Sequence, residues 1–417
     1  MRRTRPDSPL PETILIMPHT RREFLTAASL RAEVLDRARD AGDALRAGAE
    51  RTEPVGQTTV RLTTRAMACD FAVLLNPGPV EQVATASEAL DLVHVLEEQM
   101  SAYRADSELS RLNQIAAARP VRVERRLFQL LLEATRIAKA TDCAFDPTAG
   151  PLIELWRWCR RHNRIPSQSQ IDEARRKIGI ERIQFDQSAE TVQFLEPSVS
   201  LNLGGIGKGY ALDRIGEALT SRGLSDWLVH GGHSSVLARG THADLGGWPV
   251  GLRHPLFPNK RLGTLLLKNG ALSTSGSGTQ FFRHGGKRYG HIVDPRTGQP
   301  AQDMLSVTVV APTAAQADAF STAFFVAGLE KSIEFCQNQS EIGVILIPPP
   351  LRNRKLCPII CGIPDEVLFF ADTEVSWENV DRRTNATAPR GSHAMDRHGS
   401  TATDRGAVGR NDGSRKR

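Results

Sequence analysis

Apolar and polar residues follow two different spacings along the chain, and the spacing separates helices from strands. Residues 80–100 carry apolar side chains every three or four positions with polar residues between them, which predicts a helix. The same spacing predicts further helices over 127–140, 171–178 and 313–329. Short apolar runs bounded by turn residues predict strands, and these lie at 59–62, 71–75, 191–195, 227–230, 248–252, 264–267, 305–311 and 342–347.

The order of these elements predicts the fold class and one central domain. Helices and strands mix without a regular βαβ repeat, which favours an α+β fold with mixed sheets and packed helices over a doubly wound sheet. Residues 1–57 are charged and Arg-rich, so we expect a poorly ordered leader, with helical character only at 41–50. Residues 372–417 have few apolar groups, which predicts a disordered basic tail. The domain itself is expected over 58–371.

Length, charge and cysteine content exclude several classes of protein. The chain has 417 residues, of which 40% are hydrophobic, so it can bury a sizeable core and is no small disulfide scaffold. The net charge of +6 is concentrated at the two ends, and no basic stretch is interleaved with aromatic residues. Solvated tails are therefore favoured over nucleic-acid binding. None of the six cysteines forms a C-x-x-C pair, so zinc is not indicated.

Two compartments are compatible with the N-terminal sequence. Arg21 and Arg22, followed by Glu23-Phe24-Leu25, resemble the start of a twin-arginine export signal. Such a signal also needs roughly 7–15 apolar residues, and charged residues from Arg31 onward interrupt them here. The cell envelope or periplasm is expected if this signal works, and the cytoplasm if it does not. No run approaches the roughly 18 apolar residues that span a membrane.

A glycine-rich segment is the most informative one for chemistry. Residues 201–213 place four glycines within six positions, directly after an expected strand and ahead of a helix expected from Tyr210. Glycine lets the backbone approach a ligand closely. A helix N-terminus favours an anion, and Lys208 adds a positive charge. The segment matches neither the P-loop nor the dinucleotide-binding pattern, so a tight structural turn is the alternative.

Two turn-rich segments carry further candidates. Residues 144–152 contain two prolines and a glycine, which predicts a rigid loop between helices in which Asp146 can act as a local cap. Residues 291–298 combine an Asp-Pro turn with His291. An imidazole titrates near neutral pH and can serve as a base, although a single histidine is more often structural.

The helix expected at 313–329 carries a candidate metal site. Asp318 and Thr322 lie four positions apart and therefore share one face of an apolar helix. A carboxylate among apolar residues needs a partner or a cation. Hard oxygen ligands suit Mg²⁺, particularly when substrate phosphates complete the coordination. The alternative is a carboxylate that interacts only with the helix macrodipole.

Together these four segments resemble those of the FAD:protein FMN transferases, or ApbE family, both in their order along the chain and in their residues. The resemblance extends from about residue 58 to 370 and implies an ApbE-like, T-fold-like architecture. Eight motifs in the right order make coincidence implausible. The four additional ones are Met67-Ala68-Cys69, the S-x-Y motif ending at Tyr103 with the Ser107-Glu108-Leu109-Ser110 segment that completes it, Gly231-Gly232, and Ser273-Thr274-Ser275-Gly276.

The resemblance implies a role for each matched residue. Those implied to hold FAD are Met67, Tyr103, Ala144, Phe145, Asp146, Asn202, Lys208 and Ile292. Those implied to hold Mg²⁺ are the Gly205 carbonyl, Asp318 and Thr322. His291 is implied to take the proton from an incoming hydroxyl. The implied reaction moves FMN from FAD to a Ser or Thr of an acceptor protein through a phosphoester and releases AMP.

Some residues depart from the family's pattern, and two rival functions fit the same site. Asn202 stands where an Asp is usual, Ala68 and Cys69 replace Gly and Thr, His233 replaces an Asp or Asn, and Gly207 replaces a common Ala. An FAD pyrophosphatase would need the same metal and base, and an acceptor assay separates it from a transferase. A non-catalytic FAD-binding protein would bind FAD without Mg²⁺-dependent release of AMP.

Overall fold

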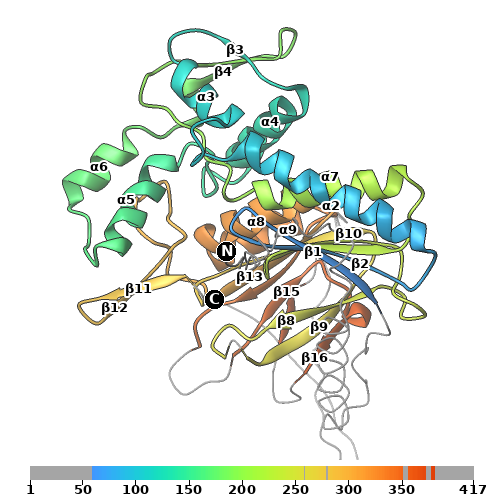
Figure 1. Cartoon of the computed structure of the whole chain (residues 1–417). Coiled ribbons are helices and arrows are strands. Elements are labelled where there is room, and N and C mark those ends of the chain that lie inside the picture. Colours follow the sequence, from blue (N-terminus) through green and yellow to red (C-terminus); the bar gives the residue numbers. More distant parts are fainter. Residues whose placement is uncertain (1–58, 258, 279, 351–355, 372–376, 381–417) are drawn as a thin grey trace, which may run out of the picture. The chain divides into compact units, whose positions relative to one another are not determined.

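The main sheet contains nine strands, and their order in the sheet is their order in the chain (Figure 1). The computed structural model describes residues 59–257, 259–278, 280–350, 356–371 and 377–380. Neighbouring strands are antiparallel except for the parallel pair β15–β17. The nine strands are β1 (Val60–Ala66), β2 (Cys69–Leu75), β6 (Trp227–Gly231), β7 (Ser235–Arg239), β10 (Gly270–Gly276), β13 (Ser306–Ala311), β14 (Gly343–Ile347), β15 (Ile359–Cys361) and β17 (Glu378–Val380).

Side chains that alternate along each strand divide the core into two layers. In β14, Val344 and Leu346 belong to one buried cluster, whereas Ile345 and Ile347 belong to another. Helices contribute to the first cluster, and a three-stranded sheet contributes to the second. Figure 1 shows these helices and the three-stranded sheet on opposite faces of the main sheet. The covering elements are α2 (Val80–Met100), α7 (Gly207–Ser221), α8 (Ala314–Ala327) and α9 (Leu329–Gln337), and opposite them β8 (Trp248–Arg253), β9 (Arg261–Leu267) and β16 (Leu368–Phe370).

Two smaller groups of helices and strands lie outside the main sheet. One contains α3 (Glu108–Ile115), α4 (Arg125–Ala140) and a sheet of β3 (Val121–Arg122), β5 (Thr191–Phe194) and β4 (Ile183–Asp186). The other contains α5 (Gly150–Arg161), α6 (Gln168–Arg175) and the hairpin of β11 (Phe281–His284) and β12 (Lys287–Gly290). Two short 3₁₀ helices are η2 (Ile180–Arg182) and η3 (Asp365–Val367).

The second group fixes the loop that contains His291. Trp156 of α5 stacks on Tyr289 with ring centroids 5.8 Å apart. The Trp156 indole N–H donates to the Gly298 carbonyl at 2.8 Å. Gly298 has a φ of 75°, and an added Cβ there would lie 2.4 Å from Ile171. Only glycine fits that position, so the loop is held closely against α5 and α6.

The α+β prediction is confirmed, and most expected helices and strands are present. The strand expected directly before the glycine-rich segment is absent, because the Leu201 N–H donates to the Asn113 side chain and the Asn202 N–H to the Pro147 carbonyl. The helix expected over 313–329 is divided by Gly328, whose φ of 82° ends α8.

Two further boundaries differ from expectation for local reasons. The helix expected at 171–178 instead begins at Gln168, because Ser167 and Gln170 form a capping box. The expected loop 144–152 ends earlier, since α5 begins at Gly150 and Pro151 occupies its first turn, where a missing N–H is tolerated.

The described part of the chain extends beyond the expected domain at its C-terminal end. β17 lies inside the range 372–417 and pairs with β15. The leader 1–57, including Arg21, Arg22 and the segment 41–50, lies outside the described residues. Among the helices that are described, none is long and apolar enough to cross a membrane.

Candidate functional site

The N-terminal ends of α7 and α8 lie in close contact. A Cβ added to Gly209 would lie 2.0 Å from the Ala314 carbonyl oxygen. One turn along α7, the Asp213 carboxylate accepts the N–H groups of Ala314 at 2.8 Å and Ala315 at 2.9 Å, and so caps α8. Burial raises the pKa of the Asp213 carboxyl to about 6. The close contact and the cap together fix how the two helices are aligned.

This alignment places Lys208 beside Asp318, a carboxylate only 4% exposed. The Lys208 Nζ lies 3.3 Å from both carboxylate oxygens. The Gly209 N–H donates to Oδ2 at 3.2 Å, while the hydroxyls of Ser235 and Ser273 donate to Oδ1 at 3.3 and 3.2 Å. The buried negative charge is therefore compensated by one cation and three neutral donors. No sequence motif identifies Ser235 as a candidate residue. The nearest motif is the Gly231-Gly232 pair that precedes it.

Thr322 and Gly205 extend this cluster by one helical turn. The Thr322 hydroxyl lies 3.4 Å from the Ser275 hydroxyl. A Cβ added to Gly205 would lie 3.5 Å from that Thr322 oxygen and 3.2 Å from the Phe145 ring, so these residues meet. The available donors are a carboxylate, hydroxyls and a backbone carbonyl, which are hard oxygen ligands of the kind Mg²⁺ prefers. No group of three or more His, Cys, Asp or Glu side chains is placed to hold a metal within the described ranges.

The 144–148 loop and the glycine-rich segment are joined through Asn202. Its N–H donates to the Pro147 carbonyl at 2.7 Å, and its side-chain oxygen accepts the Gly204 N–H at 2.9 Å. Asp146 is turned into its own loop, where Oδ1 accepts both the N–H and the hydroxyl of Thr148. Burial raises the pKa of Asp146. The structure thus shows Asp146 as a local cap, with Ala144 buried in the core beside it.

His291 is exposed to solvent and has one defined hydrogen bond. Its Nδ1 lies 3.1 Å from the Gln280 carbonyl oxygen, which can only accept. The proton therefore belongs on Nδ1, and Nε2 keeps a free lone pair. Although part of its surface is exposed, the protein atoms around the imidazole desolvate it in part and lower the pKa of His291, and the positive charges of Arg160 and Lys208 lower it further.

The other candidates have contacts of their own, and none of these contacts is to Asp318. Tyr103 is 61% exposed, and the Arg157 guanidinium lies 4.5 Å above its ring. The Met67 N–H donates to the Glu97 side chain at 2.8 Å. Ile292 packs against the helix-covered core, and its carbonyl accepts the Ala301 N–H at 3.0 Å.

Met67 and Ala68 form the two-residue turn between β1 and β2, with φ of 50° and 59°. Glycine adopts a left-handed backbone without a steric penalty, whereas the same conformation costs Ala68 about 1 kcal/mol. This explains why a glycine fits the position. Cys69 follows the turn. Its sulfur would lie 3.5 Å from a Cβ added to Gly232, and its thiol is close enough to Lys208 and Asp318 to feel both charges. The turn therefore lies within electrostatic range of Lys208 and Asp318.

Comparison with known proteins identifies the family. The sequence model of the ApbE family matches residues 57–346. The FAD:protein FMN transferase of Haemophilus influenzae is 33% identical over 256 residues, 60% of this chain and 73% of that protein. The FAD:protein FMN transferase of Treponema pallidum is 32% identical over 324 residues, 73% of this chain and 90% of that protein.

Solved structures agree with the sequence matches. The ApbE protein of Thermotoga maritima superposes with a TM-score of 0.64 at 30% identity, covering 72% of this chain and 96% of that one. The flavin transferase ApbE from Vibrio cholerae gives a TM-score of 0.64 at 28% identity, covering 72% of this chain and 97% of that one. The chain therefore belongs to the ApbE family.

Proposed function

We propose that this protein transfers FMN from FAD to a Ser or Thr hydroxyl of an acceptor protein and releases AMP, in a reaction that depends on Mg²⁺. The observation that carries the proposal is the buried Asp318 carboxylate, held between Lys208 and two serines within a chain whose matched relatives are named FAD:protein FMN transferases. An acceptor protein with a reactive hydroxyl is the partner that this reaction requires.

The residues around Asp318 fit a divalent cation and a pyrophosphate. Mg²⁺ would be held by Asp318, Thr322 and the Gly205 carbonyl, because Thr322 is one turn from Asp318 on α8, Gly205 lies against Thr322, and substrate phosphates can supply further ligands. When bound, it would neutralise pyrophosphate charge and polarise the phosphorus. Lys208, at the N-terminal end of α7, supplies a second positive charge for the same phosphates.

FAD would lie across the surrounding loops. The exposed ring of Tyr103 is available to stack on a ring of FAD. Asn202 orders the glycine-rich loop that faces the phosphates, and Phe145 packs against that loop at Gly205. The remaining FAD-binding residues that we propose are Met67, Ala144, Asp146 and Ile292.

His291 is the proposed base. The acceptor hydroxyl oxygen forms a bond to the FMN phosphorus, and the bond from that phosphorus to the bridging oxygen of the pyrophosphate breaks. AMP leaves with this oxygen and its electron pair. The hydroxyl proton passes to Nε2 of His291, which is free because Nδ1 is bonded to Gln280. Positioning and electrostatic stabilisation supply most of the rate in such transfers.

One reaction tests the function. The full chain is incubated with FAD, Mg²⁺ and a panel of Ser- or Thr-containing acceptor domains, and flavin fluorescence is read on a denaturing gel while AMP is quantified. We expect a fluorescent acceptor band that EDTA abolishes. AMP release with every acceptor band dark would instead establish a pyrophosphatase, and FAD binding without AMP would establish a carrier.

Replacing His291 separates catalysis from binding. We expect His291→Ala to slow FMN transfer by about 10²–10⁴-fold, the usual contribution of a general base, with little change in the FAD dissociation constant. Single-turnover transfer and flavin fluorescence titration measure the two quantities. His284→Ala, an exposed histidine on β11, is the matched control. Equal losses of transfer and FAD affinity in His291→Ala would show that His291 binds FAD and does not act as the base.

The pH profile reports the environment of His291. Because desolvation and nearby positive charges lower its pKa below the ordinary 6.5, the imidazole stays neutral to lower pH. We therefore expect kcat/KM to fall only below pH 6.5, as the base becomes protonated. Arg160→Gln removes one of the positive charges and should move this fall to higher pH. A wild-type profile that already falls above pH 6.5 would contradict the assignment.

A further inference from the structure

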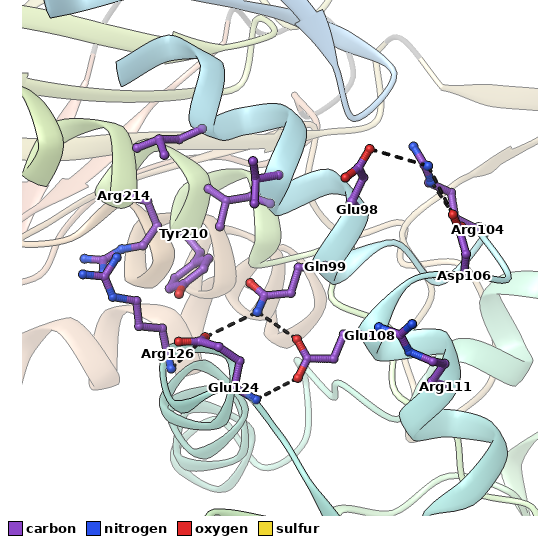
Figure 2. A pocket seen from close by; sticks show the side chains of 13 residues that line it. Glu98, Gln99, Arg104, Asp106, Glu108, Arg111, Glu124, Arg126, Tyr210 and Arg214 are labelled. Carbon is purple, nitrogen blue, oxygen red and sulfur yellow. Dashed lines mark hydrogen bonds and ion pairs between the residues drawn. The ribbon is translucent and has the colours of Figure 1, made fainter. Parts of the chain in front are cut away.

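A hollow separate from the Asp318 cluster opens between α2, α3, α4 and α7 (Figure 2). It encloses about 550 Å³, and a second hollow of about 390 Å³ shares three of its lining residues, Arg126, Tyr210 and Arg214. None of the residues assigned above to FAD, Mg²⁺ or proton transfer lines either hollow. These three shared residues therefore form a distinct cluster, which we call the Arg126 cluster.

Two buried polar groups of the Arg126 cluster lack partners among the described residues. Tyr210 is only 9% exposed, and its hydroxyl is buried without a hydrogen-bond partner. The Nε of Arg214 is also buried and unpartnered. Most buried polar groups in folded proteins are hydrogen-bonded. Two neighbouring buried donors without a partner therefore indicate a ligand that binds to them.

The Arg126 cluster also brings two positive charges close together. Figure 2 shows the Arg126 and Arg214 guanidinium groups side by side, near the Tyr210 hydroxyl. Arg214 forms an ion pair with Glu217 on its own helix, whereas the Arg126 side chain forms no hydrogen bond or ion pair with a described residue. Desolvation lowers the pKa of Arg214, and the charge of Arg126 lowers it further. Two adjacent cations of this kind favour an anion between or beside them.

The nearby carboxylates are already engaged elsewhere. Glu124 accepts the N–H groups of Arg126 and Leu127 and so caps α4. Glu108 accepts the Glu124 N–H and the Gln99 side chain. At the far end of the hollow, Glu98 and Asp106 pair with Arg104. In the second hollow, Glu133 pairs with Arg136. Glu124 and Asp213 are close enough for their charges to act on Arg214, and Glu124 also interacts with the charge of Arg126. Neither carboxylate forms an ion pair with these guanidinium groups, so their hydrogen-bonding positions remain available to an anion.

We propose that Arg126, Arg214 and the Tyr210 hydroxyl bind a phosphate group at a site separate from the flavin site. Guanidinium forks match phosphate oxygens, and the phenol O–H can donate to another oxygen of the same group. The phosphate comes either as the free inorganic ion or as the phosphomonoester end of a nucleotide. Leu92, Val95 and Leu96 of α2 line the same hollow and offer an apolar wall for a base.

Calorimetric titration of the full chain tests this site, with inorganic phosphate and AMP as separate probes at matched ionic strength. We expect saturable 1:1 binding of at least one probe. Tighter binding of AMP that persists in Lys208→Ala would assign a nucleotide site, and phosphate binding at least as tight as AMP would assign a site for the free ion. No saturable heat with either probe would overturn the proposal. No flavin is present, so the result is independent of FMN transfer.

Variants locate the binding. Arg126→Ala should weaken it by about tenfold or more, as loss of a charge-assisted hydrogen bond does, and Tyr210→Phe by about fivefold. Arg104→Ala, at the far end of the same hollow, should leave it unchanged, and thermal melts confirm that each variant is folded. Lys208→Ala distinguishes the flavin site: binding that is lost in Lys208→Ala but kept in Arg126→Ala would contradict the assignment.

Discussion

Asp318→Asn is expected to reduce FMN transfer by at least about a hundredfold while the protein remains folded. The variant keeps the side-chain shape but removes the negative charge that Lys208, Ser235 and Ser273 now surround. Losing a metal ligand that stabilises developing charge costs several kcal/mol of transition-state stabilisation, and each 1.36 kcal/mol is tenfold in rate. Transfer to an acceptor protein, followed at increasing Mg²⁺, measures the loss.

The dependence of the transfer rate on Mg²⁺ concentration shows whether the Asp318 carboxylate binds the metal or is only structural. A metal ligand predicts that the Mg²⁺ concentration for half-maximal transfer rises in Asp318→Asn, whereas a purely structural carboxylate predicts an unchanged Mg²⁺ requirement. Asp244→Asn, an exposed carboxylate, is the matched control and should behave as wild type. Full activity of Asp318→Asn at limiting Mg²⁺ would show that the metal assignment is wrong.

Gly209→Ala is expected to destabilise the protein by about 1–3 kcal/mol and to abolish most of the transfer activity. The added methyl group would lie 2.0 Å from the Ala314 carbonyl oxygen, 2.4 Å from its carbon and 2.7 Å from the Ala315 nitrogen. All three are backbone atoms, and the Asp213 cap holds that backbone in place. Relief of the clash requires α7 and α8 to separate, which moves Lys208 away from Asp318.

Gly207→Ala is the matched control for this variant. Gly207 belongs to the same helical turn, but a Cβ there would meet nothing nearer than 3.8 Å. Alanine is the better helix former, so this change should be neutral or stabilise the protein by up to about 1 kcal/mol. Denaturant unfolding and acceptor labelling of both variants give the comparison. Equal stability of Gly209→Ala and Gly207→Ala would contradict the close contact between the helices.

The elements with strong periodicity were predictable, and those that depend on polar sequences were not. The apolar spacing of 80–100 predicts the bounds of α2, since a helix covering a sheet needs one apolar face. β10 was missed because its residues 273–276 are Ser, Thr, Ser and Gly. Its position comes from pairing with β7 and β13, which local sequence does not reveal.

The grouping of the candidate residues was predictable in part for the same physical reason. Asp318 and Thr322 share a face of α8 by helical geometry alone. Their partners are reached only through tertiary structure, because Ser235 lies 83 positions from Asp318 in the chain and Lys208 lies 110 positions away. The carboxylate of Asp213 offered no local sign that it caps a different helix. The role of Trp156 in holding the His291 loop likewise depends on a contact 142 positions distant.

The strand order of the main sheet has a consequence for how the protein is made. A chain that emerges from the ribosome N-terminus first can add each strand to the edge of the one before it, because chain order and sheet order coincide. The helix with Asp318 and Thr322 comes between β13 and β14, near the end of this sequence of additions. The glycine-rich loop is therefore synthesised long before the carboxylate that it meets. A translation product that stops ahead of α8 would carry most of the loops proposed to bind FAD and neither of the proposed side-chain ligands of the metal.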